Sequence, residues 1–169
     1  MASPTDIPVL GLSVIVWLLT LYSLRAALLG DPLCAAVAGA DADLLQRAGR
    51  VVRGDATPSG DVEAAFLRRV ARLGMLELAV SLAEVATLAY FLRLRMLPWL
   101  AGALLLKTFL LLMLDMWFVR RRRNGVADIF EQLRKLPAWY LWLDRGASLA
   151  SALGLAVMFL AVNGFLGGG

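Results

Sequence analysis

Six ionisable residues lie well inside long apolar segments of this 169-residue chain. They are four acids and two cations: Glu77, Glu84, Lys107, Asp115, Asp144 and Arg145. Placing one charged group at the centre of a bilayer costs about 2.5–3.5 kcal/mol, so each group needs a partner, a proton or water. Their chemistry is therefore either charge pairing or the handling of protons and cations.

Two of these residues match in depth. Glu84 lies 12 residues after Arg72, which is about 18 Å of helix at 1.5 Å per residue. Lys107 lies 13 residues before Arg120, which is about 20 Å. Only the short turn 93–98 joins the two segments, so these segments must be antiparallel neighbours. We predict an ion pair between Glu84 and Lys107 near the middle of the membrane.

The other four charged residues lie closer to the basic end of the segments. Glu77 and Asp115 are each five residues from a marker arginine, a depth of about 8 Å. Asp144 and Arg145 follow Pro137 by seven and eight residues, a depth of about 11–12 Å. We expect Arg145 to neutralise Glu77 or Asp115. At least one remaining acid must then be protonated or reach water.

Hydroxyl side chains extend the charged helix faces. Gly74, Glu77, Ser81 and Glu84 follow steps of 3, 4 and 3, which places them on one face of a helix. The polar positions that we assign to such faces are Ser81, Thr87, Thr108, Ser148 and Ser151. Polar faces of this kind can converge inside a bundle while the apolar faces meet lipid.

Four apolar segments must position these residues, at about 7–29, 73–92, 97–119 and 138–165. Each is long enough to cross about 30 Å of hydrocarbon. The chain is 60% hydrophobic and 18% charged, whereas soluble domains are near 45–50% and about 25%. We predict an all-α fold: an integral membrane four-helix bundle that forms a single membrane domain over residues 1–169.

Basic residues set the orientation. The connections 30–72 and 120–137 lie on one side and carry 12 Lys and Arg, against two in the turn on the other side. The positive-inside rule makes these connections cytoplasmic and both termini non-cytoplasmic. We expect a bacterial cytoplasmic membrane. The first segment lacks a basic leader region, so we interpret it as a retained span and not a cleaved signal peptide.

The connections carry amphipathic stretches at 41–53 and 126–136. We expect them to form short helices that rest at the headgroup surface; docking of a partner or of anionic lipid is the alternative. Asp61 can cap a helix that continues into the second span. Gly146, Ala150 and Gly154 are spaced four residues apart, which permits a close helix contact either within the chain or between copies.

Composition excludes several classes of site. The chain has no histidine and one cysteine, Cys34, so we expect no metal site, cofactor or internal disulfide. Palmitoylation of Cys34 stays open. The basic runs adjoin spans, so we expect no nucleic-acid partner. An Asp115–Asp144 dyad is an enzymatic alternative, but no accompanying protease motif is present, so we predict no enzyme.

We therefore expect a small polytopic membrane protein, a non-enzymatic subunit or scaffold component of a larger membrane complex. Its charge network would hold the bundle together, and its partners would be the bilayer, anionic headgroups and other membrane subunits or further copies. The alternative is a component of a proton- or cation-coupled transporter or channel that uses the intramembrane carboxyl groups.

Overall fold

The computed structural model describes residues 6–57, 60–121, 130, 133–134 and 136–166. Regular structure within these ranges is helical throughout, as predicted. The helices are α1 (Asp6–Leu29), α2 (Pro32–Ala38), α3 (Ala42–Val52), α4 (Asp61–Arg93), α5 (Pro98–Arg121) and α7 (Ala138–Leu166). The predicted segments 7–29, 73–92 and 138–165 lie entirely within α1, α4 and α7, and the segment 97–119 begins one residue before α5.

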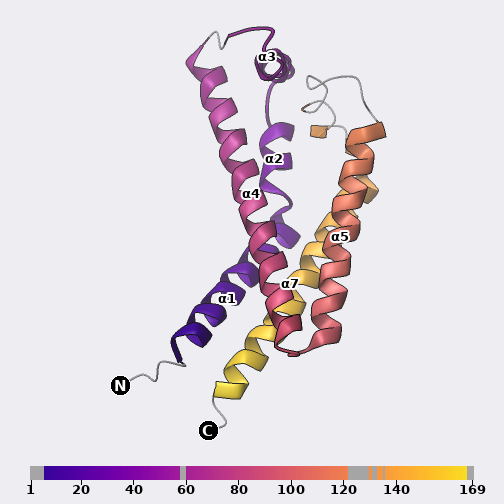
Figure 1. The fold of residues 1–169 in the computed structure, drawn as a ribbon. Coiled ribbons are helices and arrows are strands. Elements are labelled where there is room, and N and C mark those ends of the chain that lie inside the picture. The colour runs from indigo at the N-terminus through magenta and orange to yellow at the C-terminus, as the bar shows by residue number, and fades with distance from the viewer. Residues whose placement is uncertain (1–5, 58–59, 122–129, 131–132, 135, 167–169) are drawn as a thin grey trace.

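The four long helices alternate in direction (Figure 1). Both ends of the described chain and the α4–α5 turn lie at one end of the molecule, and α2 and α3 lie at the other. The turn reverses the chain through positive φ angles at Arg95 (55°) and Leu97 (46°). The predicted antiparallel hairpin of the second and third segments is therefore confirmed.

Three segments are long and apolar enough to cross a membrane: Leu10–Ala38, Asp61–Arg93 and Ala138–Gly164. The fourth apolar stretch, Pro98–Leu114 in α5, is shorter. These three segments indicate an integral membrane protein.

The main core fills the half of the molecule nearest the termini. Its buried residues come from α1, α4, α5 and α7: Val16, Leu19, Leu88, Phe91, Ala101, Leu104, Leu155, Met158 and Val162. Gly154 permits close packing here, because a Cβ atom on it would lie 2.6 Å from Leu104 Cδ1. A Cβ on Gly146 would meet nothing within 4 Å. Of these two glycines, only Gly154 makes a close helix contact within the chain.

A second, smaller core lies at the opposite end, where α3 packs on α4. It contains Val37, Leu45, Ala48 and Phe130, and the ring of Phe130 meets that of Phe66 edge-on at 6.0 Å. Protein side chains thus cover much of the apolar face of α3, which we had expected to rest on lipid. Most of the second amphipathic stretch, 126–136, lies outside the described residues.

The helix ends differ from expectation at two points. Gly30 ends α1 with φ +79°, and Asp31 then caps α2 by accepting hydrogen bonds from the amides of Leu33 (2.6 Å) and Cys34 (3.2 Å). We had not predicted α2, because seven residues are too few to show a helical period. The N-cap of α4 is Gly60, so Asp61 is the first helical residue and not the cap.

Candidate functional site

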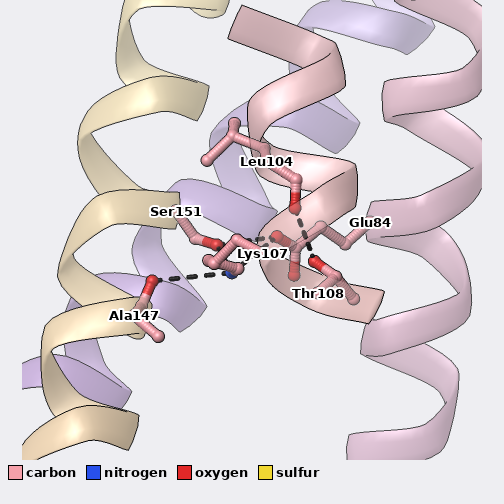
Figure 2. A network of polar contacts seen from close by, with 6 residues as sticks. All are labelled: Glu84, Leu104, Lys107, Thr108, Ala147 and Ser151. Carbon is pink, nitrogen blue, oxygen red and sulfur yellow. Dashed lines mark hydrogen bonds and ion pairs between the residues drawn. The ribbon is translucent and has the colours of Figure 1, made fainter. Parts of the chain in front are cut away.

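The predicted ion pair between Glu84 and Lys107 is present. Lys107 Nζ lies 3.4 Å from Glu84 Oε1, and only 22% of the lysine and 13% of the glutamate side chain is exposed. Ser151 of α7 joins them: its hydroxyl donates to Glu84 Oε1 at 2.7 Å and accepts from Lys107. Figure 2 shows this network between α4, α5 and α7.

The network satisfies the lysine ammonium completely. An ammonium group has three protons to donate, and Lys107 finds three acceptors: Glu84, Ser151 and the Ala147 carbonyl at 3.5 Å. The neighbouring Thr108 hydroxyl is occupied elsewhere, donating to the Leu104 carbonyl at 3.0 Å. A carboxylate, a hydroxyl and a carbonyl thus hold one partly buried primary ammonium.

The network forms one end of a polar cavity of about 240 Å³. The structure brings eight predicted site residues together around it: Glu77, Ser81, Glu84, Lys107, Thr108, Asp144, Ser148 and Ser151. The predicted convergence of polar faces from α4, α5 and α7 is therefore observed.

The cavity ends at the ion pair. One turn further toward the termini, the inward-facing residues are Leu88 on α4, Leu104 on α5 and Leu155 on α7. Leu88 and Leu155 are fully buried, and Leu104 is 5% exposed. A mainly apolar layer, which also contains the buried Thr87, therefore follows beyond the charges, and the residues that line the cavity extend only toward the end that carries α2 and α3.

Two polar atoms of cavity-lining residues are buried without a hydrogen-bond partner, Glu77 Oε1 and the Tyr22 hydroxyl. Glu77 lies within hydrogen-bonding reach of the Asp31 carboxyl, and Asp144 also lines this part of the cavity. The outer part of the cavity, around Glu77, Asp31 and Asp144, therefore carries mainly acidic groups. In the inner part, the ammonium of Lys107 neutralises the carboxylate of Glu84.

Three of our site assignments need comment. Arg145 makes no ion pair with Glu77, so that half of the expectation is wrong; pairing with Asp115 stays a prediction, because the side chain of Asp115 lies outside the described residues. The guanidinium of Arg145 lies against Gly30 at the end of α1, with Nη2 3.4 Å from where a Cβ would be. A cation is favourable there because unpaired carbonyls gather at a helix C-terminus. Thr87 is buried but lies outside the cavity lining. The side chain of Asp115 is outside the described residues, and with it the proposed Asp115–Asp144 dyad.

Among the residues that line the cavity, sequence reasoning missed the polar groups of Tyr22, Asp31 and Tyr140. Asp31 followed by proline is a recognisable helix-start signal, which would have placed a carboxyl at the end of the first span. Tyr22 carried no comparable signal. Tyr140 lies near the start of α7, where aromatic residues are typical membrane-interface anchors; Trp99 is 92% and Trp142 is 72% exposed, whereas Tyr140 lines the cavity.

No family model, curated protein or solved structure matches the chain. The site is therefore defined by its own chemistry, namely four carboxyl groups and one lysine around a polar cavity. No three acidic or cysteine side chains in the described ranges lie close enough together to hold a metal ion.

Proposed function

We propose that the chain is a four-span, non-enzymatic membrane protein that serves as a subunit or scaffold component of a larger membrane complex. The fourth span would be α5, whose 24 residues measure about 36 Å at 1.5 Å per residue. The basic connections favour a cytoplasmic position for α2 and α3, in a bacterial cytoplasmic membrane.

The network of Glu84, Lys107 and Ser151, beyond which the cavity does not continue, supports this proposal. Its contacts join three helices, and the buried apolar layer beyond it interrupts the polar path. A buried network of this kind favours one helix register, because any shift leaves charges without partners. The charges therefore serve primarily to hold the bundle in one arrangement.

The cytoplasmic end offers surfaces for partners and lipid headgroups. Arg68, Arg69 and Arg72 border a surface hollow on α4, together with Ala65 and Leu73. A row of arginines near the membrane attracts anionic headgroups. Other membrane subunits or further copies of the chain would pack against the exposed apolar faces of the long helices.

Purification of the tagged full-length chain from its native membrane in a mild detergent tests this proposal. We expect a defined assembly that is larger than one chain in its micelle, and a harsher detergent should reduce it to the single chain. A stable, lone monomer under the mild condition would contradict the proposed role.

A second candidate function is proton- or cation-coupled transport, supported by the excess of carboxyl groups around the cavity. On this proposal, Glu84→Gln should abolish proton-dependent flux in liposomes while helicity stays unchanged. Asp61→Asn, at the exposed start of the same helix, is the matched control. Unchanged flux in Glu84→Gln would rule out this role for Glu84.

A further inference from the structure

The cavity already contains one bound primary ammonium group, that of Lys107. Its acceptors are a carboxylate, a hydroxyl and a carbonyl, and they satisfy all of its protons. The structure thus shows which chemistry this cavity can provide for a cation that has left water.

The part of the cavity nearer α2 offers two of these three kinds of acceptor, carboxyl groups and hydroxyl groups. Glu77 lies two helical turns from Glu84, about 10 Å along α4, and its Oε1 atom is buried without a partner. The Tyr22 hydroxyl is likewise buried and unpartnered, and Ser81 and Asp31 line the same region. A buried polar atom without a partner has lost its hydrogen bonds to water without replacing them, so a donor that reaches both atoms would be stabilised.

We propose that the outer part of the cavity binds a small primary ammonium compound, with Glu77 as its counter-ion and Tyr22 as a hydroxyl acceptor. The space suits this class, because about 240 Å³ equals the volume of about eight waters at ~30 Å³ each. No three acids among the described side chains could share a metal ion, whereas an ammonium group needs only dispersed acceptors. The inference rests on the same cavity as the second candidate function and is independent of the subunit role.

Calorimetric titration of the detergent-purified full chain with ethylammonium chloride tests the site. We expect saturable binding, and sodium chloride and tetramethylammonium chloride at equal ionic strength should give none. Tetramethylammonium carries the same charge but has no N–H donor. Binding of sodium or tetramethylammonium with equal affinity would overturn the assignment of a primary ammonium.

Two substitutions locate the site. Glu77→Gln should weaken ethylammonium binding at least tenfold, and Tyr22→Phe, which removes only one oxygen atom, should weaken it several-fold. Asp61→Asn and Tyr90→Phe are the matched controls, because both residues are exposed and neither lines the cavity. Binding that survives both cavity substitutions would overturn the location, and Tyr22→Phe keeps this test valid if Glu77→Gln fails to fold.

A primary ammonium can be a free amine or an aminophospholipid headgroup. Nanodiscs of phosphatidylethanolamine and of phosphatidylcholine separate these sources. If the headgroup is the ligand, ethylammonium should bind in phosphatidylcholine nanodiscs and be excluded by phosphatidylethanolamine. A free-amine site should bind ethylammonium equally in both, and absence of binding in every condition would refute the proposal while leaving the subunit role standing.

Discussion

Exchanging the charges of Glu84 and Lys107 isolates the interaction that joins α4 to α5. At 3.4 Å and an effective dielectric constant of about 20, their attraction amounts to about 5 kcal/mol before desolvation is counted. Glu84→Lys or Lys107→Glu alone replaces this attraction by repulsion between largely buried like charges. We therefore expect each single reversal to lower the free energy of unfolding by at least about 3 kcal/mol.

The double exchange should recover about half of that loss. Ser151 can serve the swapped pair, because its hydroxyl both donates and accepts. The carboxylate at position 107 would, however, face the Ala147 carbonyl, which now accepts from Lys107. The carboxylate and the carbonyl are both hydrogen-bond acceptors and repel each other, so the free energy of unfolding should be recovered only in part.

Equilibrium unfolding in mixed micelles, followed by tryptophan fluorescence and far-UV circular dichroism, measures these differences. The control is the exposed pair Arg53–Asp55, at 3.2 Å with side chains 38% and 57% exposed. Its reversals should change stability by less than about 1 kcal/mol. If the double variant has a free energy of unfolding no higher than that of the less stable single variant, the pairwise interaction is refuted.

Two further predictions concern packing and helix capping. Gly154→Ala should destabilise the bundle by about 1–3 kcal/mol, because the new methyl would overlap Leu104; Gly146→Ala, in open space, should be neutral or slightly stabilising in the same unfolding assay. Asp31→Ala should cost about 1 kcal/mol and speed amide hydrogen exchange at the start of α2. Asp41→Ala at the start of α3, where the side chain makes no capping bond, should leave exchange unchanged; equal effects of the two aspartates would contradict the capping assignment.

The sequence was sufficient for the hairpin and its ion pair, because both depend on local quantities. A short turn forces α4 and α5 to be neighbours, and the rise per residue then aligns Glu84 with Lys107. The third member, Ser151, was predicted only as part of a polar face. Its position depends on how α7 packs against α5, which is a tertiary feature.

The error at Arg145 has a simple geometric cause. Depth along a helix does not specify direction, and consecutive residues point about 100° apart. Because Asp144 faces the cavity, the next side chain turns away and reaches the end of α1 at Gly30. The burial of the α3 face against Phe66 and Phe130 similarly depends on contacts between segments distant in sequence.

The residues that line the polar cavity extend from the ion pair only toward the end carrying α2 and α3, and the buried side chains of Leu88, Leu104 and Leu155 lie beyond it; we therefore predict that water enters the cavity from that end alone. Cysteine labelling in a Cys34→Ala background tests this claim with a membrane-impermeant thiol reagent applied to each side of sealed vesicles. Ser148→Cys, in the cavity, should react only from the side that carries α2 and α3, and Leu155→Cys, in the fully buried layer, should react from neither side. Reaction of Leu155→Cys, or of Ser148→Cys from the side of the termini, would contradict the account.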